Sequence, residues 1–302
     1  MSNDDGRDTT DAGTDREPAD REPDGALVLV GTPIGNLGDL SPRAIDALRD
    51  ADVISAEDSR RTRALLTHAG IAGGNRVRAV HAHNEQESAQ AVVRDVRAGR
   101  RVAYVTDAGM PGISDPGARL VRACLDAGLP VEVVPGPSAV LAALVLSGFP
   151  TDRFAYEGFL PRRGRERTAR LAELAADSRT TVLFESPRRV SATLRELREV
   201  CGPLREVAVA RELTKRFEDV WRGPLGDTDA LVAGGPPRGE HVIVVSPLPE
   251  RPQASDEEVD AHLRAALAEG LSARDAAVRV GRDLGVPRRR AYEMAVALRK
   301  RP

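Results

Sequence analysis

Three short segments rich in glycine and proline carry the residues whose types and spacing suit ligand chemistry. They are 31–37 (GTPIGNL), 106–117 (TDAGMPGISDPG) and 135–138 (PGPS), and each follows an apolar run expected to form a strand. In open α/β sheets, ligands bind at the carboxyl ends of the strands. There, Asp107 would accept hydrogen bonds from a ribose or an amino group. A tight turn explains any one such segment alone, but three at one sheet edge predict a ligand site.

The first of these loops excludes two common nucleotide sites. Gly31 and Gly35 stand four positions apart, which is not the G-x-G-x-x-G spacing of a dinucleotide site. Pro33 also removes a backbone donor where a pyrophosphate would need one. The chain has no G-K-[ST] sequence, so a P-loop is excluded as well. We therefore expect a loop that lets a ligand approach the backbone without holding a diphosphate.

Two α/β domains are expected to position the loops. In residues 25–148, expected strands alternate with expected helices, which predicts a mostly parallel sheet covered by helices. In residues 149–247, several strands follow one another directly, which predicts a mixed sheet. The expected strands are 26–30, 53–56, 77–80, 102–106, 131–134, 154–158, 181–185, 206–210, 217–222 and 241–246. The expected helices are 42–50, 60–69, 85–98, 117–127, 138–146, 165–176 and 188–200.

The two ends of the chain differ from the sheet domains. Residues 1–24 hold nine acids and three arginines without apolar periodicity, which predicts a disordered acidic tail. Residues 248–255 contain a proline-rich stretch expected to be a linker. Residues 256–302 predict a small unit of three helices, at about 256–269, 273–283 and 287–301.

Composition points to a protein of the cytoplasm. The two cysteines, Cys124 and Cys201, cannot form a disulfide framework and lack metal-ligand spacing. No apolar run approaches the length of a membrane span. Outside the acidic tail the chain is net positive by about four, because the whole chain has a net charge of -2 and the tail alone contributes -6. Only two of the 44 basic residues are lysine, a bias that suits phosphate binding without proving it.

A series of motifs in fixed order resembles a known family. The motifs are TPIGNL (32–37), AEDSRRT (56–62), HNE (83–85), DAGMPGISDPG (107–117), PGPSA (135–139), RFAYEGFLPR (153–162), FESPRR (184–189) and ARELTK (210–215). Together they are similar to the 16S rRNA cytidine 2'-O-methyltransferase family, across about residues 26–302. Each motif alone is weakly specific, whereas the ordered set is highly specific.

The resemblance implies an α/β, two-domain tetrapyrrole-methylase-like fold with a small helical C-terminal module. It also implies a homodimer that binds S-adenosyl-L-methionine between its domains and methylates 16S rRNA within the 30S subunit. The residues it assigns to the methyl donor are Pro33, Ile34, Asp107, Ala108, Gly109, Ile113, Ser114, Pro135, Gly136, Phe159, Leu160, Ala210 and Arg211. Met110 departs from the family, which usually has threonine there, at a cost of about 1 kcal/mol if a hydrogen bond is lost.

A group that accepts the ribose proton would assist the reaction, because a ribose hydroxyl is a poor nucleophile. The sequence does not rank the candidates, and a structural ion pair or helix cap explains any single one equally well. They are Glu57, Asp58, Glu185, Glu212 and Lys215. His81 and His83 lack a third ligand nearby, so no metal site is expected.

Several arginines are candidates for contact with RNA phosphates, although solvated helix faces would look the same. In the C-terminal unit, a dimerising helix bundle is an equal alternative to RNA docking. The candidates are Arg60, Arg162, Arg163, Arg165, Arg288, Arg289 and Arg290. Two rival functions stay open: a tetrapyrrole or diphthine methylase, whose first loop typically reads G-x-G-P-G, and a non-catalytic RNA-binding factor.

Overall fold

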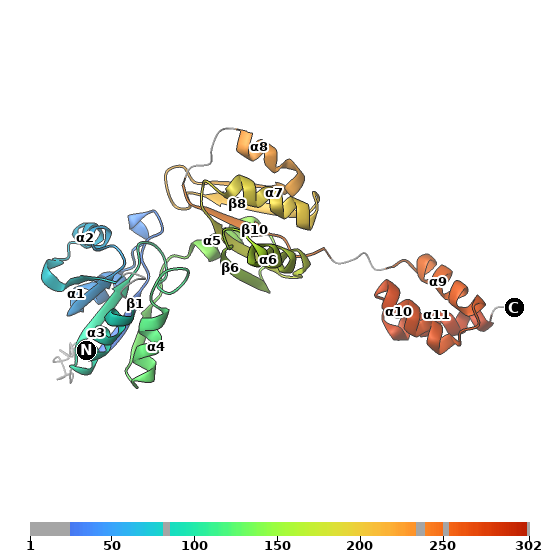
Figure 1. The fold of residues 1–302 in the computed structure, drawn as a ribbon, viewed down its shortest axis with the longest axis horizontal. Helices are drawn as coiled ribbons and strands as arrows, with labels where there is room; N and C mark the ends of the chain where they lie inside the picture. The colour runs from blue at the N-terminus through green and yellow to red at the C-terminus, as the bar shows by residue number, and fades with distance from the viewer. Residues whose placement is uncertain (1–24, 81–84, 234–238, 250–253, 301–302) are drawn as a thin grey trace, which may run out of the picture.

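The structure, a computed structural model, describes residues 25–80, 85–233, 239–249 and 254–300. Two five-stranded sheets with their helices are followed by a separate unit of three helices (Figure 1). The predicted acidic tail, His81 and His83 lie outside the described residues.

The first sheet is entirely parallel, as predicted, with strand order β3-β2-β4-β1-β5. Its strands are β1 (Ala26–Val30), β2 (Val53–Ala56), β3 (Val77–Ala79), β4 (Arg101–Val105) and β5 (Val131–Val134). From β1 the chain moves to one side of the sheet to reach β2, and from β4 it moves to the other side to reach β5. Because β1 and β4 are neighbours, the crevice where their loops diverge is a topological switch point, the usual ligand site of such sheets.

Helices cover both faces of this sheet. On one face α1 (Pro42–Asp50) and α2 (Ser59–His68) bury side chains such as Leu48 and Leu66 against alternate strand residues. On the other face lie α3 (Glu85–Arg97) and α4 (Ala118–Asp126). Two of these helices begin at N-cap residues, since the side chain of Ser41 accepts a backbone hydrogen bond at the start of α1 and that of Asp58 does so at the start of α2.

The second sheet is mixed, as the succession of strands predicts, with order β6-β7-β10-β8-β9. Its strands are β6 (Phe154–Phe159), β7 (Thr180–Glu185), β8 (Glu206–Arg211), β9 (Asp219–Pro224) and β10 (His241–Val245), of which only β6 and β7 pair in parallel. On one face pack α6 (Arg165–Ala176) and α7 (Val190–Cys201). The opposite face packs against α5 (Ala139–Ser147), which directly follows the PGPS loop of the first sheet. The chain therefore joins the two sheets beside that loop.

One strand differs from its prediction by more than one residue at an end. The expected strand 217–222 is wrong by two residues, because β9 begins at Asp219. Residues 212–218 instead form a tight turn in which Glu212 and Thr214 have φ values of 50° and 64°. A short helix, α8 (Thr228–Ala233), was also not predicted from the sequence, since six residues are too few for helical periodicity to show.

The C-terminal unit has its own apolar core. It consists of α9 (Asp256–Ala268), α10 (Ala273–Leu284) and α11 (Arg288–Lys300), packed around residues such as Leu263 and Val280. Ser255 and Ser272 cap the first two of these helices, and Gly285 ends the second in the left-handed region that glycine favours. Among the helices of the described residues, none combines the length and the apolar character needed to cross a bilayer.

Candidate active site

The structure brings the three glycine- and proline-rich loops together at the switch point. Thr32 and Gly109 exchange two backbone hydrogen bonds, of 2.9 and 3.1 Å, which tie the loop after β1 to the loop after β4. The loop after β5 packs directly on the first, since a Cβ atom added to Gly31 would lie 2.6 Å from the backbone nitrogen of Gly136. Both positions therefore require glycine for steric reasons.

A cavity of about 310 Å³ opens beside these loops and is closed by the second sheet. The first half of its wall comes from residues of the β1, β4 and β5 loops and from the start of α5. The second half comes from the ends of β6, β7 and β10 and from the turn after β8. The lining residues are Ile34, Ala108, Gly109, Met110, Ile113, Ser114, Asp115, Ser138, Ala139, Val140, Phe159, Phe184, Glu185, Ser186, Pro187, Leu213, Glu240, His241 and Val242.

The residues assigned to the methyl donor by resemblance divide into three groups. Ile34, Ala108, Gly109, Ile113, Ser114 and Phe159 line the cavity. Pro33, Asp107, Pro135 and Gly136 belong to the loops that form its rim but are not among its lining residues. Leu160 and Ala210 are buried in the core of the second sheet, and Arg211 pairs with Asp219 at 3.3 Å.

Two polar atoms at the end of β4 have no partner within the described residues. The hydroxyl of Thr106 and one carboxylate oxygen of Asp107 are buried without a hydrogen bond. Burying a polar atom in this way costs free energy, so such atoms mark a place where a ligand is expected to supply the missing partner. The other oxygen of Asp107 lies 3.4 Å from the guanidinium of Arg61. The loop therefore fits a ligand that donates hydrogen bonds, such as a ribose or an ammonium group.

The site includes one carboxyl group whose pKa lies near neutral pH, and the sequence did not single this residue out. Asp115 is half-buried in the cavity wall, in the loop between β4 and α4. Burial, followed by the negative charges of Glu57, Asp107 and Glu240, raises the pKa of Asp115 to about 7. A carboxyl group with this pKa can accept a proton at physiological pH.

The raised pKa of Asp115 predicts a pH-dependent gain in stability for Asp115→Asn. In the folded state the protonated carboxyl is favoured, so its stabilising contribution is complete below pH about 4 and lost as pH rises through about 7. Asparagine stays neutral, so the variant should melt about 2 °C above the wild type near pH 8, a value kept small because the group is partly solvated. The two proteins should melt alike only below pH about 4, where the wild-type carboxyl is neutral in both the folded and the unfolded state. Melting curves at the two pH values test this, and an equal difference at both would contradict it.

Comparison with known proteins identifies the fold and the family. The sequence model of the tetrapyrrole (corrin/porphyrin) methylases matches residues 26–229, and that of the RsmI C-terminal HTH domain matches residues 253–299. A Synechocystis protein named ribosomal RNA small subunit methyltransferase I is 43% identical, over 91% of this chain and 98% of its own length. The chain belongs to the tetrapyrrole methylases of this small subunit methyltransferase I family. The Mycobacterium tuberculosis protein of the same name is 44% identical, over 91% of this chain and 96% of its own length.

Solved structures agree with the fold of this methylase. A cobalt precorrin-4 methyltransferase matches with a TM-score of 0.55 at 23% identity, covering 73% of this chain and 94% of its own. A Thermus thermophilus uroporphyrin-III C-methyltransferase complexed with S-adenosyl homocysteine matches with a TM-score of 0.52, also at 23% identity, covering 74% and 97%. The ordered motifs of the sequence thus led to the correct family and the correct fold.

Four of the five candidate proton acceptors, Glu57, Asp58, Glu212 and Lys215, are not among the residues that line the cavity of this methylase. The carboxylate of Asp58 caps α2 by accepting bonds from the backbone of Arg60 and Arg61, which lowers its pKa. Glu57 accepts a long bond, 3.4 Å, from the backbone nitrogen of Asp107. Glu212 and Lys215 form an ion pair of 3.0 Å, which lowers the pKa of the glutamate and helps raise that of the lysine. A cap and a charged pair are poor proton acceptors, because each already stabilises its charged form.

Glu185 lines the cavity, but its side chain is a structural anchor. The side chain is 0% exposed, and its carboxylate accepts a 2.6 Å bond from the hydroxyl of Thr193. It also accepts a 2.8 Å bond from the backbone nitrogen of Ser186 and lies 3.4 Å from Arg189. These contacts tie the end of β7 to α7 and leave no side-chain surface for a substrate.

The anchor predicts an effect of Glu185→Gln on stability rather than on chemistry. The amide can replace only part of the acceptor set, so the free energy of unfolding should fall by about 1–3 kcal/mol. The folded variant should keep kcat within about threefold of the wild type, because no reacting atom is touched. Urea denaturation and turnover measured below the unfolding transition test this. A large loss of kcat at unchanged stability would show that the carboxylate takes part in the reaction.

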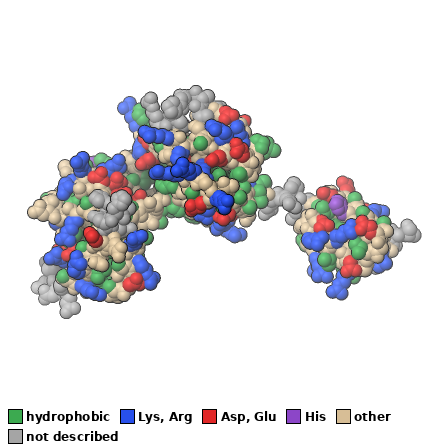
Figure 2. All heavy atoms as spheres, in the orientation of Figure 1, with side chains coloured by type: hydrophobic (Ala, Val, Ile, Leu, Met, Phe, Trp, Pro, Cys, Tyr) green, Lys and Arg blue, Asp and Glu red, His purple; other side chains and the backbone are tan. Residues whose placement is uncertain are grey.

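The arginines predicted to contact RNA are spread over both sheet domains and the C-terminal unit. Arg60 lies at the start of α2, and Arg162, Arg163 and Arg165 lie at the start of α6, all exposed. In α11, Arg288 and Arg289 are exposed, whereas Arg290 is half-buried and pairs with Asp256. Figure 2 shows basic and acidic side chains interspersed on the visible face, so net charge alone does not locate an RNA surface.

Two neighbouring arginines have other roles in this methylase. The guanidinium of Arg167 is buried and bonds to Glu196, to Thr193 and to the carbonyl of Pro161. Arg170 pairs with Glu157 at 2.7 Å. Arg167 therefore stabilises the packing of α6 on α7.

As for metals, no group of three or more His, Cys, Asp or Glu side chains in the described part of the chain is arranged to hold an ion.

Proposed function

We propose that this chain transfers a methyl group from S-adenosyl-L-methionine to the ribose 2'-hydroxyl of a cytidine in 16S ribosomal RNA. The observation that carries the proposal is the cavity at the switch point, because three ligand-type loops meet there and one of them carries the buried, unpaired oxygens of Thr106 and Asp107. The names of the relatives support rRNA as the substrate, and the S-adenosyl homocysteine complex of a solved homologue supports the donor. The choice of a cytidine and of its 2'-hydroxyl rests on the resemblance of the motifs.

The chain's own residues would hold the donor in the cavity. The buried oxygens of Thr106 and Asp107 are available to hydroxyl or ammonium donors, and Ile34 and Gly109 offer an apolar wall close to the backbone. When bound, S-adenosyl-L-methionine supplies a methyl group on a positively charged sulfur. The acidic surroundings of Asp115 favour a positively charged ligand.

Asp115 is the residue that we assign to proton removal. As the ribose oxygen forms its bond to the methyl carbon, the bond from that carbon to sulfur breaks and the hydroxyl proton passes to the Asp115 carboxylate. The carboxylate lies in the cavity wall, in the loop that also carries Ser114, whose hydroxyl bonds to that of Tyr156 on β6. This contact links the loop to the second sheet, so it orients the loop relative to both walls of the cavity.

The C-terminal unit would dock the RNA, and the enzyme would act as a homodimer in the cytoplasm. The matched HTH model supports the first role, and the exposed arginines of α11 would contact phosphates. For the dimer, α5 is apolar on every side, with Val145 71% and Leu141 52% exposed beside its buried face. An apolar surface of this kind is usually covered by a partner. Sedimentation of the purified protein tests the dimer.

Methyl transfer to ribosomal subunits tests the function itself. Purified 30S subunits from a strain lacking the modification should accept labelled methyl groups, and primer extension at low nucleotide concentration should stop at a cytidine. Binding of S-adenosyl-L-methionine is measured separately by calorimetry. Methylation of a porphyrinoid instead of RNA would refute the substrate, and absence of donor binding would favour a non-catalytic RNA-binding factor.

A further inference from the structure

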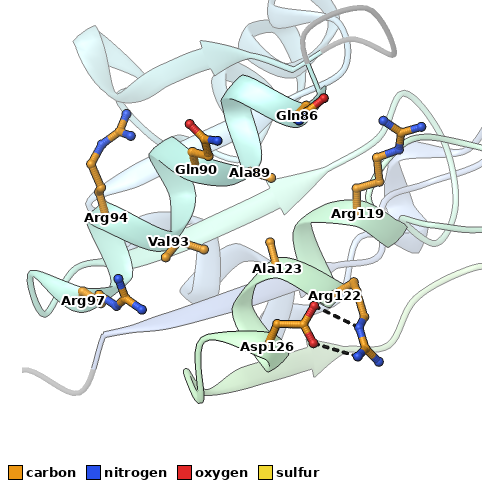
Figure 3. Close-up of a pocket in the computed structure, with 10 residues that line it drawn as sticks. All are labelled: Gln86, Ala89, Gln90, Val93, Arg94, Arg97, Arg119, Arg122, Ala123 and Asp126. Carbon is orange, nitrogen blue, oxygen red and sulfur yellow. Dashed lines mark hydrogen bonds and ion pairs between the residues drawn. The ribbon is translucent and has the colours of Figure 1, made fainter.

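A second concave surface lies between α3 and α4, which cover one face of the first sheet. We call it the α3–α4 groove; it has a volume of about 490 Å³. Figure 3 shows arginine side chains projecting from both helices around a floor of small apolar side chains. Its lining residues are Gln86, Ala89, Gln90, Val93, Arg94, Arg97, Arg119, Arg122, Ala123 and Asp126.

The charge of the α3–α4 groove is strongly one-sided. Four arginines face one carboxylate, so its lining carries a net charge of 4 - 1 = +3. Within the described residues, Arg94 and Arg97 are exposed and form no ion pair. Arg122 pairs with Asp126 at 2.7 Å, but both side chains are more than half exposed, so the pair contributes little and can open. The groove therefore offers guanidinium groups to an external anion.

The position of the α3–α4 groove relates it to the cavity. Because the sheet is parallel, α3 and α4 both begin near the edge where its strands end, and α4 directly follows the loop that carries Asp115. Gln86 and Arg119 lie in the first turns of their helices, whereas Arg97 ends α3. Eleven helical positions separate Gln86 from Arg97, a span of about 16 Å. The arginines thus extend from the cavity edge along the outside of the sheet.

We propose that the α3–α4 groove binds the phosphate backbone of the RNA strand that flanks the target nucleotide. This inference rests on the proposed function and adds the path of the substrate. Arginine binds phosphate oxygens in bidentate fashion, and the floor residues Ala89, Val93 and Ala123 have no polar side-chain atoms for reading bases. The groove therefore holds the strand mainly through its phosphates, with Gln86 and Gln90 as the two neutral polar side chains of its lining.

A second copy of the chain is a poorer occupant. In a two-fold symmetric contact the same patch meets itself, so the four arginines of each copy would be balanced by one carboxylate, Asp126, per copy. Like charges brought together in an interface cost free energy. A polyanion does not meet this obstacle, since each phosphate releases counterions when it binds an arginine.

The test compares Arg94→Ala/Arg97→Ala with a control pair, Arg43→Ala/Arg49→Ala. The control arginines are exposed on α1, on the opposite face of the sheet, and their replacement removes the same charge as the test pair. Binding of each full-length protein to 30S subunits is measured at several salt concentrations. Loss of two phosphate contacts should lower the slope of log affinity against log salt by about 1.4 and weaken binding at 0.15 M salt by about tenfold. The control pair should leave the slope unchanged, and donor affinity should stay constant in both variants.

Each other outcome is informative in a different way. An unchanged slope in Arg94→Ala/Arg97→Ala, with the wild type methylating 30S subunits, would overturn the RNA-binding role of the groove and leave the proposed function intact. Dissociation of a wild-type dimer into monomers in this variant would also overturn it, since the groove would then be a subunit interface. If Arg94→Ala/Arg97→Ala lowers the slope as expected but the wild type methylates no RNA, the proposed function fails, while the groove stands as an RNA-binding surface.

Discussion

Asp115→Asn is expected to lower kcat by about 10²- to 10⁴-fold, the usual contribution of a positioned proton acceptor. The amide keeps the shape of the carboxyl group and cannot accept the ribose proton. Donor binding should change by less than about threefold, since the methyl donor carries no proton that Asp115 must remove. Single-turnover methylation of 30S subunits, with donor affinity measured by calorimetry, separates the two effects.

The pH profile provides the sharper readout for Asp115. Its pKa is raised to about 7, so the carboxylate that accepts the proton is absent at low pH and appears as pH rises through neutrality. The rate of the chemical step should therefore increase about tenfold per pH unit below about 7 and level off above it. Asp115→Asn should lose this dependence. Asp46→Asn, an exposed position on α1, is the control and should keep it. A wild-type rate that is flat between about pH 5 and 8 would remove Asp115 from the reaction.

Gly136→Ala is expected to abolish tight donor binding. Its added Cβ would lie 2.8 Å from the Cα and carbonyl carbon of Gly31, and backbone atoms cannot move aside as a flexible side chain can. The two loops would have to separate, which displaces the Thr32–Gly109 bridge at the floor of the site. We expect donor affinity to fall by more than about tenfold and the free energy of unfolding to fall by about 1–3 kcal/mol.

Gly73→Ala is the matched control for this steric effect. Gly73 also has an ordinary negative φ, of -68°, and its added Cβ would meet only side-chain atoms, the nearest at 3.2 Å on Leu66. Donor affinity should therefore be unchanged in Gly73→Ala, with a small change in melting temperature. Normal donor affinity in Gly136→Ala would show that the loops tolerate separation and that their close packing does not shape the site.

The elements of this protein follow largely from local sequence. Alternating apolar strands and capped helices predict the parallel sheet, and Ser41 and Asp58 cap their helices as their side chains suggest. The prediction was less accurate at residues 212–218, where a turn with positive φ at Glu212 and Thr214 displaces the start of β9. A turn of this kind has no periodicity, and neither residue is the glycine or asparagine that usually marks it.

The sequence by itself also determined the family, because eight motifs in order specify the pocket-forming loops together. Only the tertiary structure decided which side chains line the cavity. The pKa of Asp115 depends on burial and on charges from Glu57 and Glu240, which are distant along the chain. The same packing buries the carboxylate of Glu185 beneath α7 and brings Arg94 and Arg97 of α3 into one groove with Arg119 and Arg122 of α4. Local sequence sets backbone preferences, whereas electrostatic environment depends on neighbours that only the folded chain brings together.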